Sequence, residues 1–403
     1  MIKGTGGKRP ADRARPTSSD TRAKLNDDPR AGDQLPRGPS ADDGPLHLDP
    51  TRSPVPVSTV PVEQRAGRTT AARRVDRRGL AGRSFAAIDL GSSSAKLLVQ
   101  TMGADGKLRT VADVKIGAAL GKGVTNGGPI PPENQQRALV ALEKLIAIAA
   151  QHGVQAQDIP MITTAVVRNA SNGAELLARI KGERGLTRAQ VLSGDDEARG
   201  GYLGALMMMH GKRGRYATLD LGGGSFQLAI GTDRKMQDGG STQVGSNLIL
   251  DTMLAPRARP DGTGDLASLA EVDRKLDPLA PMPLDVAELK GRTLVATGGV
   301  SKFLRAHFGK DVIGRDEIDA LRRQMIVLPY SARVPLVQGT KDNATCTALG
   351  IDTPDGALDY GKKLPASASL LLHILDGIGV TEVRVSETDA RHALIDGRVT
   401  EAT

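Results

Sequence analysis

The sequence is poor in cysteine, in aromatic side chains and in long apolar runs. Its 403 residues include one cysteine, Cys346, no tryptophan, four tyrosines and four phenylalanines. A single cysteine excludes an intramolecular disulfide framework and a cysteine-based zinc cluster. So few aromatic rings give little material for a surface that stacks the bases of single-stranded nucleic acid. No apolar run approaches the roughly 18 residues of a membrane span, and the first residues lack the apolar core of a secretory signal. We therefore expect a cytoplasmic protein with no membrane partner.

The excess of basic charge is concentrated in the first 83 residues. The whole chain has 54 Lys and Arg against 46 Asp and Glu, a formal net charge of +8. Residues 1–83 contain 17 of the basic and 10 of the acidic side chains, 10 of the 23 prolines and no aromatic residue. Because so few apolar groups cannot offset the entropy of ordering the chain, we expect a disordered basic tail over residues 1–83. Residues 84–403 are almost neutral, so the charge argues against nucleic acid as a partner except through the tail. The basic cluster at 73–78 (RRVDRR), near the end of the tail, could anchor an anionic polymer or serve as a solvated linker.

Two similar strand–turn–strand segments follow the tail. In the first, apolar runs within residues 85–100 flank the turn Gly-Ser-Ser-Ser at 91–94. In the second, apolar runs within residues 217–230 flank Gly-Gly-Gly-Ser at 222–225. An Asp-Leu pair precedes each turn. A repeated hairpin of this kind indicates two related domains that face each other.

The segments between and after the hairpins alternate between strand and helix patterns. Apolar spacing, proline at a helix start and glycine at a helix end define these elements. We expect strands at 108–116, 159–167, 191–193 and 293–296, and helices at 131–153, 173–180, 195–210 and 301–308. This order predicts an α/β fold with a first domain over residues 84–211 and a second over 212–403, whose last helix could pack back on the first.

The glycine turns have the composition of phosphate-binding loops. Glycine permits close approach of the backbone, whose N–H groups donate to phosphate oxygens together with serine hydroxyls. Asp89 and Asp220, which precede the two hairpin turns, can hold Mg²⁺ beside the phosphates. A third turn, at 297–299, follows the strand expected at 293–296. One such turn often only connects strands, whereas three in one chain predict a phosphate site.

Two further segments contain the groups that phosphoryl hydrolysis requires. Hydrolysis needs a base that orients water and cations that offset negative charge. Residues 193–199 (SGDDEAR) place three carboxylates at an expected helix start, where they could equally serve only the helix dipole. Arg168 could clamp a phosphate through its planar guanidinium or form an ordinary surface ion pair.

In their order these motifs resemble the exopolyphosphatase and guanosine pentaphosphate phosphatase (Ppx/GppA) family. The resemblance extends over about residues 84–395 and rests on segments 88–94 (IDLGSSS), 164–173 (TAVVRNASNG), 193–199 (SGDDEAR), 220–225 (DLGGGS), 296–299 (ATGG) and 385–391 (VSETDAR). It implies an actin-like fold, that is, two ribonuclease-H-like α/β domains with a cleft between them. It also implies a short form of the family and suggests a homodimer.

The resemblance further implies a reaction and assigns roles to matching residues. The expected reaction is Mg²⁺-dependent release of terminal orthophosphate from inorganic polyphosphate, or from guanosine pentaphosphate, a nucleotide of the stringent response. Glu197 aligns with the glutamate that activates water, and Arg168 and Gln227 complete the catalytic set. Asp89 and Asp220 would organise Mg²⁺. The implied phosphate-binding residues are Gly91, Ser92, Ser93, Ser94, Lys96, Asn172, Gly222, Gly223, Gly224, Ser225, Gly298 and Gly299.

Several positions depart from the family pattern. Gln227 stands where the family has a glutamate of the metal and water site, so we expect weaker attraction of Mg²⁺ and weaker activity. Ser93 replaces an asparagine, Asp196 replaces a glutamate, and residues 361–365 (GKKLP) replace a different family segment. These departures leave open a weakly active or non-catalytic regulator that binds polyphosphate or guanosine tetraphosphate.

Overall fold

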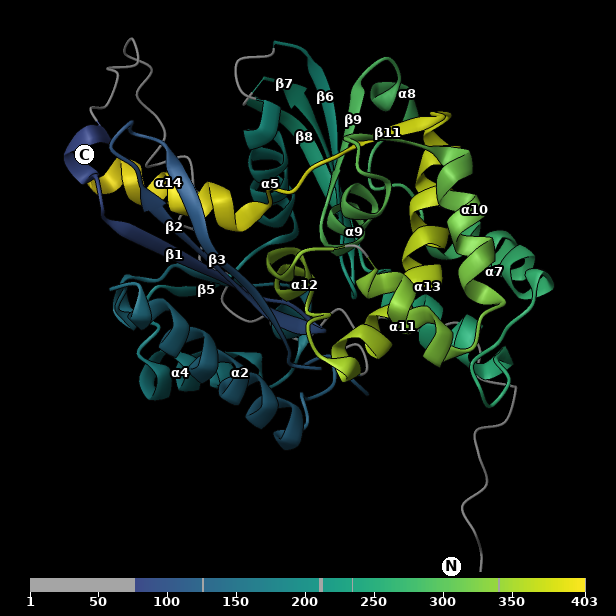
Figure 1. Cartoon of the computed structure of the whole chain (residues 1–403), viewed down its shortest axis with the longest axis horizontal. Coiled ribbons are helices and arrows are strands. Elements are labelled where there is room, and N and C mark those ends of the chain that lie inside the picture. Colours follow the sequence, from purple (N-terminus) through teal and green to yellow (C-terminus); the bar gives the residue numbers. More distant parts are fainter. Residues whose placement is uncertain (1–76, 125–126, 210–212, 234, 340, 403) are drawn as a thin grey trace, which may run out of the picture. The chain divides into compact units, whose positions relative to one another are not determined.

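The part of the chain that the structure describes contains two mixed β-sheets. The computed structural model describes residues 77–402 except 125–126, 210–212, 234 and 340. The first sheet has the strand order β3-β2-β1-β4-β5, and the second has the order β10-β11-β9-β6-β7-β8 (Figure 1). The strands are β1 (Ser84–Leu90), β2 (Ser94–Met102), β3 (Leu108–Gly117), β4 (Met161–Thr163), β5 (Ala189–Val191), β6 (Arg215–Leu221), β7 (Phe226–Thr232), β8 (Lys235–Thr242), β9 (Thr293–Thr297), β10 (Val312–Gly314) and β11 (Glu382–Val385).

The same strand arrangement occurs in both sheets. In the first, β1, β2 and β3 form an antiparallel meander, and β4 and β5 continue from β1 in parallel. In the second, β6, β7 and β8 repeat the meander, and β9 and β11 repeat the parallel additions. β10 adds an antiparallel edge strand beside β11. This ribonuclease-H-like order confirms the predicted α/β class and the predicted hairpin repeat.

Helices cover both faces of the first sheet. Side chains alternate between the two faces along β1. Ile88 therefore packs with Leu139 on the side of α2 and α4, whereas Phe85 packs with Ile395 and Val399 of α14 on the other side (Figure 1). The α-helices are α2 (Pro132–Gln151), α3 (Ala165–Asn169), α4 (Gly173–Arg184), α5 (Gly194–Ala205), α6 (Ser246–Ile249), α7 (Leu266–Leu279), α8 (Val286–Leu289), α9 (Gly299–Phe308), α10 (Arg315–Ile326), α11 (Tyr330–Gln338), α12 (Asn343–Leu349), α13 (Pro354–Ile378) and α14 (Ala390–Ala402).

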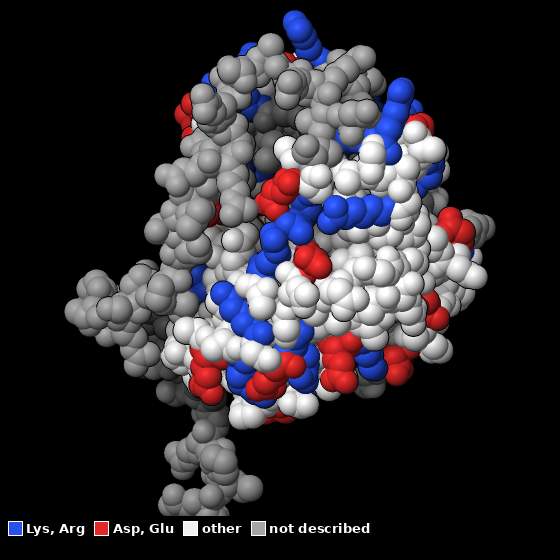
Figure 2. All heavy atoms as spheres, turned by 90° about the vertical axis from the view of Figure 1, so that its left-hand side faces the viewer, with Lys and Arg blue, Asp and Glu red and all other residues white. Residues whose placement is uncertain are grey.

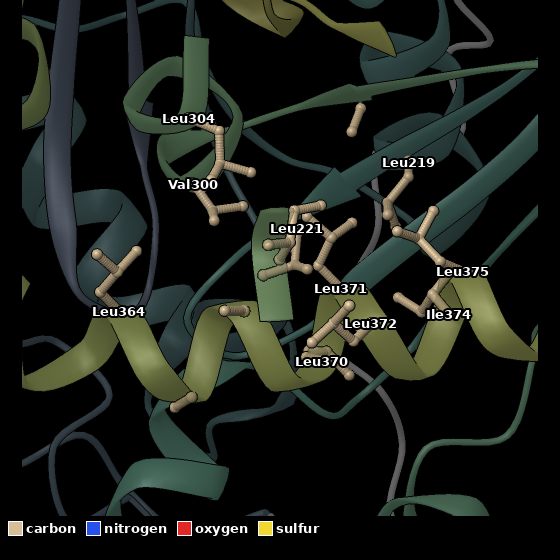
Figure 3. Packing of buried hydrophobic residues seen from close by; sticks show 14 of the residues in the cluster. Leu219, Leu221, Val300, Leu304, Leu364, Leu370, Leu371, Leu372, Ile374 and Leu375 are labelled. Atoms are coloured by element: carbon tan, nitrogen blue, oxygen red, sulfur yellow. The ribbon is translucent and has the colours of Figure 1, made fainter. Parts of the chain in front are cut away.

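The long helix α13 is central to the core of the second sheet. Its Leu371 and Leu375 belong to one buried cluster with Leu221 of β6 and Val300 of α9 (Figure 3). Burying a side chain of this size stabilises the fold by about 1.5–3 kcal/mol. The cluster therefore holds β6 and α9 in place, and with them the second and third glycine turns, which adjoin these elements.

Two local predictions need correction. Residues 159–167 were expected to be a strand, but only Met161–Thr163 pair in the sheet and Ala165–Asn169 form α3. The second half of the apolar run forms this helix, and its residues Ala165 and Val167 are buried on α3. Helix α5, placed by the sequence in the first domain, packs against β6, β7 and β8 of the second sheet. The predicted boundary between residues 211 and 212 lies outside the described residues and stays a prediction.

Residues 77–83, assigned by the sequence to the disordered tail, have defined structure. Residues Arg77–Leu80 form a 3-10 helix, and Arg77 Nη2 lies 2.9 Å from Asp396 Oδ1 of α14. This ion pair and the packing of Leu80 against the α14 side of the first sheet hold the segment in place. The rest of the predicted tail, residues 1–76, lies outside the described residues.

Charges of both signs occur on the described surface. On the face drawn in Figure 2, Lys and Arg side chains lie among Asp and Glu, most densely along its lower edge. This mixture agrees with the near-neutral balance of residues 84–403. Among the helices that the structure describes, none has both the length and the apolar character of a membrane span.

Candidate active site

The two hairpin loops are closed by the same backbone hydrogen bond. The Gly91 N–H donates to the Ser94 carbonyl, and the Gly222 N–H donates to the Ser225 carbonyl, both at 3.0 Å. Each loop therefore turns between its strands with the same spacing, and the predicted repeat extends from strand order to loop geometry.

The segment that follows the third strand of each meander supports the loop. After β3, the N–H groups of Ala118 and Ala119 donate to the Ser93 carbonyl, and after β8 the Asn247 N–H donates to the Gly223 carbonyl. In these hydrogen bonds the acceptors are the Ser93 and Gly223 carbonyls of the two loops. Within the described part of the chain, five loop N–H groups donate to no protein acceptor and are available to phosphate oxygens: those of Ser92, Ser93, Gly223, Gly224 and Ser225.

The two loops lie against each other. Asn247 Nδ2 donates to Ser93 Oγ at 2.8 Å and so connects the second sheet to the first loop. A Cβ atom at position 223 would lie 2.4 Å from Ser93 Oγ, and one at position 224 would lie 2.8 Å from Ser92 Oγ. A side chain at Gly223 or Gly224 would displace the Ser93 or Ser92 hydroxyl, so glycine favours the close approach of the two loops.

The two predicted metal-binding aspartates occupy equivalent positions. Asp89 lies opposite Lys96 in the β1–β2 pair, and Asp220 lies opposite Gln227 in the β6–β7 pair. Lys96 Nζ donates to Asp89 Oδ2 at 2.9 Å. The Asp89 carboxylate and burial have opposite effects on the pKa of Lys96, and the carboxylate prevails and raises it. Lys96 therefore stays charged at neutral pH.

Asp220 has no comparable partner. No hydrogen bond or ion pair reaches its carboxylate from the described residues, and burial raises its pKa to about 6 against the opposing charge of Lys96. A desolvated carboxylate in this state favours a cation. No group of three or more His, Cys, Asp or Glu in the described chain is arranged to hold a metal. Two carboxylates completed by phosphate oxygens and water are nevertheless a set that Mg²⁺ uses, so Asp89 and Asp220 fit the ion.

Glu197 is the member of the acidic helix start that turns inward. Ser193 caps α5 by accepting a hydrogen bond from the Asp196 N–H, and its hydroxyl donates to Asp196 Oδ2. Asp195 is exposed. Glu197 is 11% exposed, and its pKa is raised to about 7 chiefly by burial, with Arg168 opposing the rise and the nearby Asp220 and Asp89 adding to it. Asp195 and Asp196 thus fit the role of acidic residues that interact favourably with the helix dipole. Glu197 instead lies near Asp220 and Asp89.

Helix α5 brings Glu197 to this place through its backbone. A Cβ atom at Gly201 would lie 3.4 Å from Asp220 Cβ, so α5 crosses Asp220 at close range. Residues four apart share a face of a helix. Glu197 therefore lies on the α5 face that is turned toward Asp220.

Arg168 forms an ion pair with Glu197. Its Nη1 donates to the Leu192 carbonyl at 2.7 Å and to Glu197 Oε2 at 3.3 Å. The guanidinium therefore fixes the carboxylate between α3 and α5, and its other N–H groups can still meet phosphate. The sequence alternative of an ordinary surface ion pair does not fit, because the Arg168 side chain is only 16% exposed.

Gln227 is buried beside the second loop. Its Nε2 donates to Ser225 Oγ at 2.9 Å and to Ser241 Oγ at 3.0 Å. The amide N–H groups therefore face hydroxyls at the position where the resemblance implied a carboxylate.

The third glycine turn starts α9 next to Asp220. Gly298 has φ +92°, and a Cβ atom there would lie 3.1 Å from Asp220 Oδ1. Gly299 is the first residue of α9, and its carbonyl accepts a hydrogen bond from the Tyr360 hydroxyl at 2.8 Å. The positive end of the α9 dipole therefore lies beside Asp220, as suits a bound anion.

Asn172 does not join the site as predicted. Its Oδ1 accepts from the Ile130 N–H at 2.8 Å and its Nδ2 donates to the Ile130 carbonyl at 3.0 Å. Both atoms of the amide are thus used to hold the segment before α2, and the geometry supports a structural role.

A cluster of buried charges that the sequence did not predict joins β3, α9 and α14. Asp113 of β3 binds Lys302 of α9 at 2.7 Å and Arg391 of α14 at 2.7 Å. Arg391 also binds Asp389 through two nitrogens, at 3.0 and 2.6 Å. The segment 385–391 was noticed only for its resemblance, and nothing in the sequence pairs Asp113 with residues about 190 and 280 positions later.

The comparisons with known proteins agree with this geometry. Residues 99–310 match the sequence profile of the Ppx/GppA phosphatase family. Exopolyphosphatase 1 of Mycobacterium tuberculosis H37Rv is 26% identical over 162 residues, which are 40% of this chain and 46% of that protein, and the Mycobacterium bovis protein gives the same values. The chain thus spans about half the length of the curated relatives that it matches.

Solved structures show the same fold. An exopolyphosphatase of Cytophaga hutchinsonii has a TM-score of 0.62 and 21% identity over 78% of this chain and 98% of that one. A Ppx/GppA family member of Aquifex aeolicus has a TM-score of 0.59 and 19% identity over 79% of this chain and 99% of that one. The profile match covers more than half of the sequence, and the chain belongs to the Ppx/GppA phosphatase family.

Proposed function

We propose that the chain is a phosphoanhydride hydrolase that releases terminal orthophosphate from inorganic polyphosphate. One observation carries the proposal: the Glu197 carboxylate, largely buried and held by Arg168, lies with Asp89 and Asp220 next to two loops in which several described N–H groups have no protein acceptor. The family and the names of its relatives support the same class of reaction. Guanosine pentaphosphate is the alternative substrate, because its terminal phosphoanhydride offers the same chemistry.

Different residues bind the phosphoryl group, offset its charge and accept the proton. The N–H groups of the two loops bind the terminal phosphoryl group, and Lys96 and Arg168 offset its charge. Glu197 accepts a proton from a water molecule, whose oxygen forms a bond to the terminal phosphorus. The bridging P–O bond then breaks, and the shortened chain leaves with the electron pair. When bound by Asp89 and Asp220, Mg²⁺ would supply charge neutralisation at the phosphate oxygens.

Gln227 favours a second candidate, a regulator that binds polyphosphate or guanosine tetraphosphate with little turnover. An amide in place of a carboxylate contributes no negative charge toward a metal ion, and its N–H groups are directed to Ser225 and Ser241. Binding through the loops does not depend on that charge, so a chain with this replacement could retain affinity while losing rate.

The deciding experiment measures phosphate release from long-chain polyphosphate and from guanosine pentaphosphate, each with Mg²⁺ and with a chelator. The wild type is compared with Glu197→Gln and with Asp195→Asn, a control at an exposed carboxylate of the same helix turn. We expect Glu197→Gln to lower the rate by about 10²–10⁴-fold while calorimetric binding persists. The control should retain the wild-type rate.

Two results would contradict the proposal. Equal rates for the wild type and Glu197→Gln would remove Glu197 as the base. Tight binding of both substrates without phosphate release, unchanged in Gln227→Glu, would establish the regulator instead.

A further inference from the structure

Asp89, Lys96 and Lys115 form a row across three neighbouring strands. Lys96 lies opposite Asp89 in the β1–β2 pair and opposite Lys115 in the β2–β3 pair. Residues in register on adjacent strands point to the same face of a sheet, and adjacent strands lie about 4.8 Å apart. The row therefore extends outward from the metal-binding carboxylate in steps of about 4.8 Å. The equivalent row in the second sheet is Asp220, Gln227 and Ser241, which has no cation.

Lys115 is a half-buried cation without a carboxylate partner. Its Nζ donates to the Leu349 carbonyl at 3.0 Å and lies 5.3 Å from the centre of the Tyr360 ring. Its neighbours Lys96 and Lys302 are paired with Asp89 and Asp113, whereas no ion pair to Lys115 occurs in the described part of the chain. An ammonium group has three N–H donors, so two remain for an external acceptor.

The local backbone holds the Lys115 side chain in this position. Gly350, at φ +66°, ends α12, and a Cβ atom there would lie 3.2 Å from the Lys115 carbonyl and 3.3 Å from its Cγ and Cδ. Only glycine allows both the positive φ and this approach. Tyr360 in turn donates to the Gly299 carbonyl. Lys115 is thus held between the first hairpin and the third glycine turn.

The charges around Lys115 are mostly positive. Lys96 faces it from β2, Lys302 from α9, and Lys363 from α13. Asp359 of α13 is a nearby carboxylate that opposes them, and it is itself bound by Lys363 at 2.9 Å. Burial, followed by Lys96 and Lys363, lowers the pKa of Lys115 to about 7. An anion placed between Lys96 and Lys115 would relieve this repulsion and favour the charged form.

We propose that Lys115 is a specificity-determining residue that binds a second phosphoryl group of the substrate, while Lys96 and the loops bind the terminal one. The proposal rests on the proposed function in taking an anhydride-linked phosphate chain as the ligand. With this role, Lys115 favours substrates that carry at least one more phosphoryl group next to the reacting one. A substrate with a single phosphoryl group reaches Lys96 but leaves Lys115 with its carbonyl and aromatic partners only.

The test compares Lys115→Met and Lys115→Arg with Lys122→Met, a matched control because Lys122 is exposed and lies in the segment after the same strand. Steady-state rates are measured with tripolyphosphate and with acetyl phosphate, which has a single phosphoryl group. We expect Lys115→Met to raise KM for tripolyphosphate at least tenfold with kcat changed less than threefold. Its KM for acetyl phosphate should stay within twofold of wild type, and Lys115→Arg should restore most of the affinity. An equal loss for both substrates would mean that Lys115 only supports the fold.

Equilibrium binding separates this proposal from the proposed function. Calorimetry with tripolyphosphate reports the affinity whether or not the chain hydrolyses it. A wild type that binds tenfold more tightly than Lys115→Met supports the subsite even if no phosphate is released, and equal affinities overturn it. If Lys115→Met does not fold, Lys115→Gln replaces it.

Proton uptake gives a further readout. At pH 8, calorimetry in two buffers of different ionisation enthalpy should show more proton uptake by the wild type than by Lys115→Arg, whose guanidinium is always charged. Equal uptake by the two proteins would show that binding does not change the protonation of Lys115.

Discussion

Lys96 and Gln227 occupy the same position in the two hairpins, each opposite the aspartate that precedes a glycine loop. Lys96 pairs with its aspartate, Asp89, at 2.9 Å, whereas Gln227 turns its amide to two serine hydroxyls. Asp89 thus has a cation of the chain as its ion-pair partner, whereas Asp220 forms no ion pair within the part of the chain that the structure describes. We therefore expect an added cation to interact chiefly with Asp220.

Gln227→Glu should therefore strengthen Mg²⁺ binding. The Ser225 and Ser241 hydroxyls can reverse and donate to a carboxylate, so the local structure can be kept. We expect the Mg²⁺ concentration for half-maximal phosphate release to fall about tenfold, equivalent to ~1.4 kcal/mol. A Mg²⁺ titration of the rate measures it, with Gln227→Met as the uncharged control of similar size. Superimposable titration curves for the wild type and Gln227→Glu would show that this position does not influence the metal.

Asp220→Asn should stabilise the metal-free protein at pH 8. The folded-state pKa of Asp220 is about 6, above its usual 3.8, so the folded state binds protons more tightly than the unfolded state. Stability therefore falls as the pH rises from about 4 to about 6, and the loss persists above that range. Removing the ionisable group removes this loss. Thermal unfolding should show a Tm several degrees higher than wild type at pH 8 and no difference near pH 4.

Mg²⁺ provides the control for the Asp220 variant. Because a bound cation compensates the carboxylate, added Mg²⁺ should raise the Tm of the wild type more than that of Asp220→Asn. A lower Tm for the metal-free variant at pH 8 would contradict the assignment of Asp220 as an uncompensated buried charge.

The pH dependence of the reaction should report the ionisation of Glu197. A general base must be deprotonated, and the pKa of Glu197 is about 7, so kcat/KM should rise with pH and level off above that value. Arg168 lowers the pKa of Glu197, and Arg168→Gln should move the inflection to higher pH as well as lower the rate. The measurement is a pH profile of kcat/KM for both proteins. An inflection that stays in place in the variant would show that another group titrates.

The local elements of the site could be predicted from the sequence, whereas its long-range pairings could not. Short apolar runs around glycine and serine suffice to predict hairpins, because turn chemistry and strand alternation are local. They placed Asp89 and Asp220 correctly at the strand ends. Lys115 gave no signal, because its position depends on register with Lys96 and on the distant turn at Gly350. The short helix that carries Arg168 was missed because a run of Ala and Val fits a buried strand equally well.

Arg391→Met should strongly destabilise the fold. Arg391 is 1% exposed and binds both Asp113 and Asp389, so its removal leaves two buried carboxylates with less compensation. Breaking a buried ion pair by removing one partner costs about 3–5 kcal/mol. Arg305→Met is the matched control, since Arg305 also binds two acidic residues, Asp311 and Glu387, but at the surface, where the cost is about 1 kcal/mol or less. Urea unfolding of the three proteins measures both losses, and a loss for Arg391→Met no larger than that of the control would show that Lys302 and His392 suffice to hold the cluster.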